Sequence, residues 1–313
     1  MIIPLPQTNT RTIVKELTSA QEHYTHATGR VLTLIVVASA SDDIDNILDS
    51  VRTASHEHPS RVLVVIANPD NPQTSIDAEL RVGGEAGSSE IVVMQLHGAL
   101  AGQAEAVVTP LLLPDTPIVA WWPTRAPHNP AQDPIGRIAQ RRITNVLHEA
   151  SSGREALQSV ASGYSPGDSD MAWAAITLWR GIVASALDRY PQEPVISATI
   201  AGPAAAPAVD IAAGWLADRL GVEVNREYRE ATAGRQGFPI EGLHFERDSS
   251  NVTIKVVDND TVKVSVPGSP ASLVALNVRT QAEMLSEELR HLDTDHAYAH
   301  ALRALGRVTY GES

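Results

Sequence analysis

The stretch 91–145 constrains the fold of this chain more than any other. It opens with the apolar run Ile91–Leu96, continues through a helical segment at Gln103–Leu113, and returns as a second apolar run at Thr116–Pro123. Strand, helix and strand in this order form a βαβ unit, and such units build parallel sheets. The stretch closes with Asp133–Asn145, which carries three arginines and which we interpret as a turn and a helix. The sequence therefore predicts an α/β fold with a basic element beside the end of a parallel sheet.

The rest of the N-terminal half repeats this alternation. Val31–Ala38 and Arg61–Ala67 are apolar runs rich in β-branched residues, which is typical of central strands. Between them, Ile44–Val51 has apolar residues at helical spacing. We expect an N-terminal α/β domain over residues 1–165, with a mostly parallel sheet and flanking helices.

The boundary and the second half follow from composition and spacing. Ser151–Asp170 is rich in serine and glycine, so we place the domain boundary there and expect the second domain to be 166–313. Met171–Asp188 is predicted to be one long helix. Four strand-like runs lie between residues 222 and 266, and two final helical segments lie within 280–305. This order predicts a mixed sheet with C-terminal helices.

Length and composition exclude several function classes. The chain has 313 residues, enough for two domains, and its apolar fraction of 43% is that of a globular protein. A net charge of −13 argues against nucleic acid as a partner, because phosphate contacts need clustered basic residues. The absence of cysteine excludes disulfides, thiolate nucleophiles and cysteine-ligated metals. No signal peptide or membrane span is evident, so we expect a cytoplasmic protein without membrane contact.

The sequence offers few catalytic candidates. The first strand-to-helix turn, Ala38–Asp43, has two carboxylates and no glycine, which disfavours a dinucleotide phosphate there and favours a helix N-cap. His97 follows a strand, where a general base is conceivable, but no nucleophile motif accompanies it and a structural histidine is the simpler interpretation. We therefore expect no cofactor and no catalytic residues.

A cluster near the C-terminus has residue types that bind metals. His296 and His300 lie one helical turn apart, with Asp293 and Asp295 just before them. Carboxylates at a helix start also cap the helix and complement its dipole. We favour capping and expect both histidines on the helix surface, with no metal.

Arginine and tryptophan side chains supply the candidate partner-binding residues, because both types are enriched at binding hot spots. We predict partner contacts at Arg137, Arg141, Arg142, Trp122, Trp179 and Arg180. Arg137 and Arg141 are spaced to share a helix face, and the alternative for the arginine group is a solvated face. Along one continuous helix, Trp173 and Trp179 would point to different faces, so we expect Trp173 in the core and Trp179 with Arg180 outside it.

Segments spread over nearly the whole chain resemble one known family. They are, in family order, Val31–Val37, Pro117–Trp122, Asp133-Pro134, Arg141–Asn145, Met171–Trp173, Leu178–Arg180, Leu285–Arg290 and Leu292-Asp293. The family they resemble is that of the glucose-6-phosphate dehydrogenase assembly proteins, also called OpcA. The resemblance implies a non-enzymatic protein that binds glucose-6-phosphate dehydrogenase and raises its activity, as an allosteric effector in the oxidative pentose phosphate pathway.

The resemblance transfers no catalytic residue, because the family has none established. Family members from photosynthetic bacteria are regarded as cysteine-dependent redox partners, and a chain without cysteine cannot share that regulation. The alternative hypothesis is a sugar-phosphate-binding protein or enzyme that uses Arg137, Arg141, Arg142 and His97, since arginine suits bidentate phosphate recognition.

Overall fold

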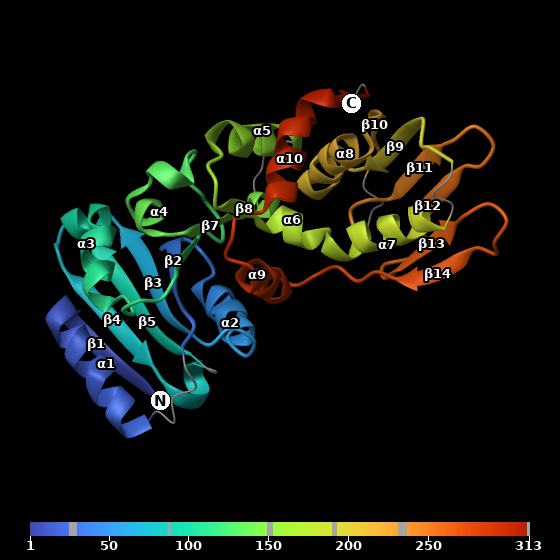
Figure 1. Cartoon of the computed structure of the whole chain (residues 1–313). Coiled ribbons are helices and arrows are strands. Elements are labelled where there is room, and N and C mark those ends of the chain that lie inside the picture. Colours follow the sequence, from blue (N-terminus) through green and yellow to red (C-terminus); the bar gives the residue numbers. More distant parts are fainter. Residues whose placement is uncertain (25–29, 87–88, 149–152, 190–192, 231–236, 312–313) are drawn as a thin grey trace. The chain divides into compact units, whose positions relative to one another are not determined.

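The computed structural model describes residues 1–24, 30–86, 89–148, 153–189, 193–230 and 237–311 (Figure 1). The chain forms two compact units, and each unit takes segments from both halves of the chain. Unit 1 comprises Met1–Asn145, Gly167–Ser169 and Gln281–Thr294, and unit 2 comprises Val146–Pro166, Asp170–Thr280 and Asp295–Ser313. The expected division between residues 165 and 166 follows chain order, whereas these units exchange segments across it.

Unit 1 is built on a sheet of eight described strands in the order β1-β4-β5-β3-β2-β6-β7-β8. Their bounds are β1 Ile2–Thr8, β2 Leu32–Ser39, β3 Ser60–Asn68, β4 Ile76–Arg81, β5 Glu90–His97, β6 Ile118–Trp121, β7 Arg141–Thr144 and β8 Asp168–Asp170. Strands β5, β3, β2, β6 and β7 pair in parallel, and β4 and β1 add an antiparallel edge. The prediction of a mostly parallel first sheet is confirmed.

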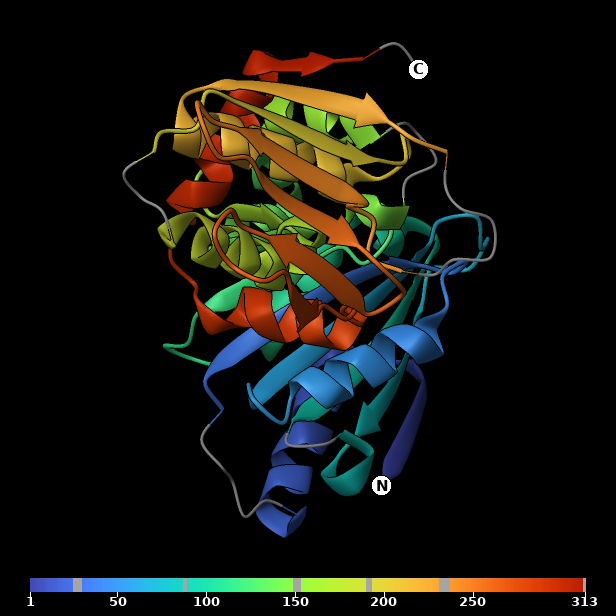
Figure 2. The ribbon, with the colours of Figure 1, turned by 90° about the vertical axis from the view of Figure 1, so that its right-hand side faces the viewer.

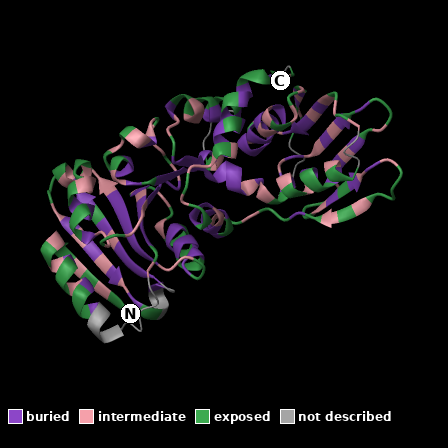
Figure 3. Ribbon diagram, viewed as in Figure 1, coloured by how far each residue is buried: buried purple, intermediate pink, exposed green. Residues whose placement is uncertain are grey.

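Apolar runs explain why the central strands lie where they do. All residues of β2 except Val37 and Ser39, and all residues of β3 except the last two, are buried, as expected for strands covered on both faces (Figure 3). The helices of unit 1 are α1 Thr10–Tyr24, α2 Ile44–Ala54, α3 Ala104–Val108, α4 Pro134–Ile138 and α9 Gln281–Arg290. Helices α1, α3 and α4 contribute to one core with the sheet, and α2 packs beside α9 (Figure 1).

Unit 2 is built on a sheet of seven described strands in the order β14-β13-β12-β11-β9-β10-β15. Their bounds are β9 Ser197–Gly202, β10 Glu223–Tyr228, β11 Gly242–Glu246, β12 Val252–Val256, β13 Thr261–Ser265, β14 Ser272–Ala275 and β15 Val308–Tyr310. Strands β9, β10 and β15 pair in parallel, and β11 to β14 pair antiparallel. The prediction of a mixed second sheet is confirmed.

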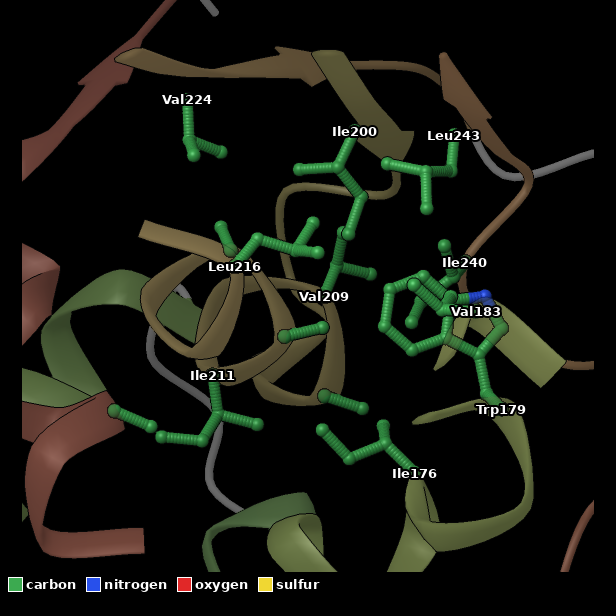
Figure 4. Packing of buried hydrophobic residues seen from close by; sticks show 14 of the residues in the cluster. Ile176, Trp179, Val183, Ile200, Val209, Ile211, Leu216, Val224, Ile240 and Leu243 are labelled. Atoms are coloured by element: carbon green, nitrogen blue, oxygen red, sulfur yellow. The ribbon is translucent and has the colours of Figure 1, made fainter. Parts of the chain in front are cut away.

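Helices cover one face of the second sheet. The helices of unit 2 are α5 Gly153–Gly163, α6 Met171–Ala175, α7 Thr177–Asp188, α8 Pro207–Leu220 and α10 His296–Ala304. The core packs α7 and α8 against the strands, with Trp179, Val209 and Leu216 meeting Ile200 and Leu243 (Figure 4). The opposite face of the sheet is turned to the viewer in Figure 2, with the helices behind it.

Helix α8 is buried almost all round because it lies between the sheet and other helices. It begins at Pro207, whose missing N–H costs nothing at a helix start, and ends before Gly221, which adopts φ +67. At Gly214 an added Cβ would stand 2.4 Å from the Ala301 carbonyl oxygen, so only glycine permits this approach of α10.

Short 3-10 helices connect these elements at Gly83–Ala86, Gly98–Gly102, Thr109–Leu111, Pro130–Gln132, Val146–His148 and Leu305–Arg307. Among the described residues, no helix has the length and apolarity needed to cross a membrane.

Candidate functional site

The basic segment Asp133–Asn145 folds differently from the turn and helix that the sequence predicts. Asp133 caps α4 by accepting from the amides of Ile135 and Gly136, and the helix ends at Ile138. The chain then turns into β7, where Arg141 pairs with Val119 of β6 in parallel register. Arg137 and Arg141 therefore do not share a helix face, and that expectation is wrong.

Arg141 is buried in an ion pair inside unit 1. Its side chain is 4% exposed and donates to Glu288 Oε2 of α9 at 2.6 Å, and to the Asp293 carbonyl at 2.9 Å. The same carboxylate oxygen of Glu288 accepts from the Ser169 hydroxyl at 2.5 Å. The arginine thus joins β7, α9 and the segment at residue 169 within one unit.

Arg142 forms a second buried pair. Its Nε donates to Asp168 Oδ1 at 2.5 Å, and Nη1 donates to the Ala139 carbonyl at 2.9 Å. Gly167 lies against this guanidinium with φ +95, and a Cβ there would stand 2.5 Å from the Gln140 carbonyl oxygen. The close approach explains why the residue before Asp168 is glycine.

The hypothesis that these arginines form an exposed basic feature is wrong for Arg141 and Arg142. Successive strand residues point to opposite faces, and a covered strand buries both. Arg137 has a 58% exposed side chain and lies 3.4 Å from the half-exposed Glu105. Its contact with a partner stays a prediction.

The tryptophans also lie in the cores rather than on a surface. Trp122 is 2% exposed and its amide donates to the Ile143 carbonyl at 3.0 Å, directly after β6. Trp179 is 1% exposed and meets Trp215 edge to face, with ring centroids 6.0 Å apart. The expectation that Trp179 lies outside the core is therefore wrong, and contact of either tryptophan with a partner stays a prediction.

A helix break explains the error at Trp179. The expected single helix divides into α6 and α7 at Ile176, which has φ −97 and ψ 6. After this break the side chains of α7 no longer point in the directions expected for one continuous helix. Trp173 and Trp179 are both buried. Trp173 donates from Nε1 to Asp295 at 2.7 Å, and the Arg180 guanidinium stacks 3.5 Å from the Trp173 ring centroid. Arg180 is half-buried, and its contact with a partner stays a prediction.

His97 has a structural environment. It is 6% exposed, with Nε2 3.0 Å from Asp77 Oδ2 and Nδ1 3.3 Å from the Asn71 amide nitrogen. The backbone N–H of Gln7, together with His97, lowers the pKa of Asp77 below its ordinary value. Both ring nitrogens are therefore engaged, which confirms the structural interpretation.

The end of β2 is the point where a doubly wound sheet would bind a ligand. Parallel strands β3 and β6 flank β2 on opposite sides, so the strand order reverses there. Asp42 accepts from the Ser39 amide at 2.7 Å and from the Thr124 hydroxyl, beyond β6, at 2.8 Å. Asp43 caps α2 by accepting from the Asn46 amide at 3.1 Å, so the predicted N-cap is confirmed. The chain's own carboxylates are therefore bonded at the end of β2.

The C-terminal histidine cluster is also structural. Asp295 caps α10 by accepting from the Tyr298 amide at 2.9 Å. His296 and His300 are both exposed, and His300 Nδ1 lies 3.6 Å from Asp218. Capping by Asp295 and the surface position of both histidines are confirmed.

Two family models match the chain in sequence order. The glucose-6-phosphate dehydrogenase subunit N-terminal domain matches residues 51–162, and the C-terminal domain of the same subunit matches residues 166–302. The chain belongs to the OpcA family of glucose-6-phosphate dehydrogenase assembly proteins. Curated proteins give no significant sequence match.

Solved structures show only distant likeness to this OpcA-family chain. A 3-ketoreductase from Actinomadura kijaniata, solved with NADP and TDP-benzene, is 10% identical with a TM-score of 0.45, over 90% of this chain and 100% of that chain. An inositol dehydrogenase homologue from Azotobacter vinelandii, solved with NADH and myo-inositol, is 10% identical with a TM-score of 0.43, over 91% and 96%. At these scores the likenesses carry no argument about this family member.

Sequence reasoning also missed a buried charge cluster in the OpcA-family chain. In unit 2, Arg226 and Asp210 are both 0% exposed, with Nε 3.1 Å from Oδ1. The guanidinium also donates to the carbonyls of Gly202 and Pro203. Burial raises the pKa of Asp210 to about 6, against the opposing charge of Arg226. The signal was an aspartate between Val209 and Ile211, within the otherwise apolar stretch Pro207–Ala217.

Proposed function

We propose that this chain is a non-catalytic subunit that binds glucose-6-phosphate dehydrogenase and raises its activity. One observation carries the proposal: the two domain models of a glucose-6-phosphate dehydrogenase subunit match in order over residues 51–162 and 166–302. Activation means that the chain binds the active state of the dehydrogenase more tightly than the inactive state. The protein would then act in the oxidative pentose phosphate pathway as an allosteric effector.

The carboxylates at the end of β2 support a role without coenzyme. A dinucleotide would place its pyrophosphate against the N-terminus of α2, where free backbone N–H groups and glycine are needed. Here Asp43 caps that helix, and Asp42 joins Ser39 to Thr124 across the point where the strand order reverses. Two carboxylates would repel a phosphate in the same place.

Three of the four residues named for the alternative sugar-phosphate site already have partners within unit 1. Arg141 and Arg142 donate to Glu288 and Asp168 within unit 1, and both guanidinium groups are buried. His97 bonds to Asp77 and Asn71. A phosphate would have to displace these partners before it could bind.

The test is a titration of the purified chain into a fixed amount of dehydrogenase from the same source, with NADPH production as the readout. We expect the rate to rise and saturate at a fixed molar ratio, and the chain alone to produce no NADPH from glucose 6-phosphate. No change in rate and no complex by size-exclusion chromatography would refute the proposal. Turnover by the chain alone would contradict its non-catalytic part.

A further inference from the structure

Among the described residues of unit 2, no helix or strand covers the second face of the second sheet. Helices α7 and α8 pack on the inner face, and the outer face of β9 to β14 is turned to the viewer in Figure 2. Burial alternates along β12 and β13, so that Val252, Ile254, Val262 and Val264 point inward. The residues between them point outward, as the two-residue period of a strand requires.

Two of the chain's three lysines meet on this outer face. Lys255 of β12 lies directly opposite Lys263 of β13 in the antiparallel register, and both side chains are exposed. The third, Lys15, lies on α1 in unit 1. Like charges directly opposite each other destabilise a sheet pair. Within the described part of the chain neither lysine has an ion-pair or hydrogen-bond partner, so nothing there offsets this repulsion.

Exposed apolar side chains flank the lysines. Leu273 of β14 lies opposite Lys263 in register and is 69% exposed, and Val257, directly after β12, is 55% exposed. We call Lys255, Val257, Lys263 and Leu273 the lysine patch. Exposed apolar side chains beside these two lysines offer a partner both apolar contact area and charge complementarity.

The sheet is hollowed beside the lysine patch. Gly242 of β11 lies opposite Lys255 in register and Ala201 of β9 lies opposite Gly242. An added Cβ at Gly242 would meet nothing within 4 Å, and a depression over these small residues is lined by Lys255 together with Glu227 and Arg229. A carboxylate side chain entering the depression would reach the Lys255 ammonium.

We propose that the lysine patch is the surface with which this chain binds glucose-6-phosphate dehydrogenase, through carboxylates that the dehydrogenase presents. The inference rests on the proposed function and names its contact surface. Charge complementarity selects this partner chemistry: in a chain of net charge −13, two adjacent unpaired lysines fit an acidic surface.

A second copy of this chain is the less favourable occupant of the same patch. A twofold axis through the patch would bring one lysine pair against its own copy, and like charges in juxtaposition oppose such contact. An axis shifted toward β10 would offer Glu227 instead, but that carboxylate already pairs with Arg229 at 3.3 Å. Dimerisation through this face is therefore an outcome that the test must be able to detect.

The test uses two charge-matched double variants of the full chain. Lys255→Glu with Lys263→Glu reverses the patch, and Arg11→Glu with Lys15→Glu makes the same change in charge on the exposed residues of α1. Affinity for the dehydrogenase is measured by biolayer interferometry at several salt concentrations, together with stimulation of NADPH production. Circular dichroism and thermal melting establish that both variants are folded.

We expect the patch variant to bind at least about 10-fold more weakly than wild type and to lose the salt dependence of binding, while the control variant binds within about 3-fold of wild type. Equal binding by folded patch and control variants would overturn the inference and leave the proposed function standing. Failure of the wild-type chain to bind the dehydrogenase would remove the proposed function itself. A wild-type dimer in solution that the patch variant breaks, without any change in dehydrogenase binding, would assign the patch to a second copy.

Should the patch variant fold poorly, Leu273→Asp gives an independent reading. Its side chain is 69% exposed, so the change costs the fold little, and it places a negative charge beside Lys263. We expect weaker binding by about 10-fold or more, because a hot-spot apolar contact is replaced by a charge that repels the partner's carboxylates. Unchanged binding by this variant would contradict the inference.

Discussion

Replacing Glu288 by glutamine tests the buried ion pair on which unit 1 depends. The change keeps the size of the side chain and removes its charge. It leaves the guanidinium of Arg141 buried, with the Asp293 carbonyl still accepting from it and, among the described residues, no carboxylate paired with its charge. The arginine keeps its charge throughout the assay, because a guanidinium group does not lose its proton in proteins. Breaking a buried pair by neutralising one partner costs about 3–5 kcal/mol.

Glu105→Gln is the matched control for this perturbation. Glu105 and Arg137 form an ion pair of the same residue types in the same unit, at 3.4 Å, but with side chains 40% and 58% exposed. Exposed pairs contribute about 0–1 kcal/mol, because water screens the charges. The two variants therefore remove the same formal charge, one from a buried pair and the other from an exposed pair.

The assay is urea denaturation followed by circular dichroism, supported by calorimetry. We expect Glu288→Gln to lower the free energy of unfolding of unit 1 by about 3–5 kcal/mol, and its melting temperature by about 6–20 °C for a unit of this size. Glu105→Gln should change the free energy by less than about 1 kcal/mol. Equal and small effects of both variants would refute the reasoning that burial makes the Arg141–Glu288 pair essential.

Three further predictions concern packing, ionisation and backbone strain. Trp179→Ala should destabilise unit 2 by about 3–5 kcal/mol, whereas Leu178→Ala, at a 47% exposed position, should change stability by about 0.5 kcal/mol, both by urea denaturation. In the folded state the pKa of Asp210 is raised to about 6, so the folded state binds this proton more tightly than the unfolded state. The free energy of unfolding should therefore fall by about 3 kcal/mol as pH rises from about 4 to 6. Asp210→Asn should remove this fall, as measured by urea midpoints at a series of pH values. Gly167→Ala should lower the stability of the fold by about 1–3 kcal/mol more than Gly83→Ala. Both glycines have positive φ, but of the two only Gly167 would bring a Cβ against a carbonyl oxygen. Equal losses of thermal stability in the two variants would contradict this.

Much of the fold could be predicted because its signals are local. The β-branched runs at Val31–Ala38 and Arg61–Ala67 became β2 and β3 in the centre of a parallel sheet, and Asp43 capped the helix that follows. Runs of this kind specify strands wherever both faces are covered. Local pattern was therefore sufficient for the strands and for the cap.

The candidate binding residues could not be predicted because their environment depends on distant segments. Glu288 is 147 residues from Arg141 in the sequence, and neither residue carries a local sign that the other will bury it. Spacing alone placed Arg137 and Arg141 on one helix, but the chain leaves the helix at Ala139 and the pairing with β6 then decides where Arg141 points. The break at Ile176 misplaced Trp179 in the same way, since a single non-helical residue changes every later angular position.

The exchange of segments between the units has a consequence for how the protein is synthesised. Helix α9 belongs to unit 1, although its residues lie near the C-terminal end of the sequence. It supplies Glu288 to Arg141 and packs on α2. A ribosome releases the chain from its N-terminus, and domains usually fold as their residues emerge. The first sheet of this protein must instead wait, with Arg141 uncompensated and one side of α2 uncovered, until residue 294 has emerged. Unit 2 will by then have most of its strands available, so the unit that begins the chain is completed late, and a chaperone that shields α2 during that interval would raise the yield of folded protein.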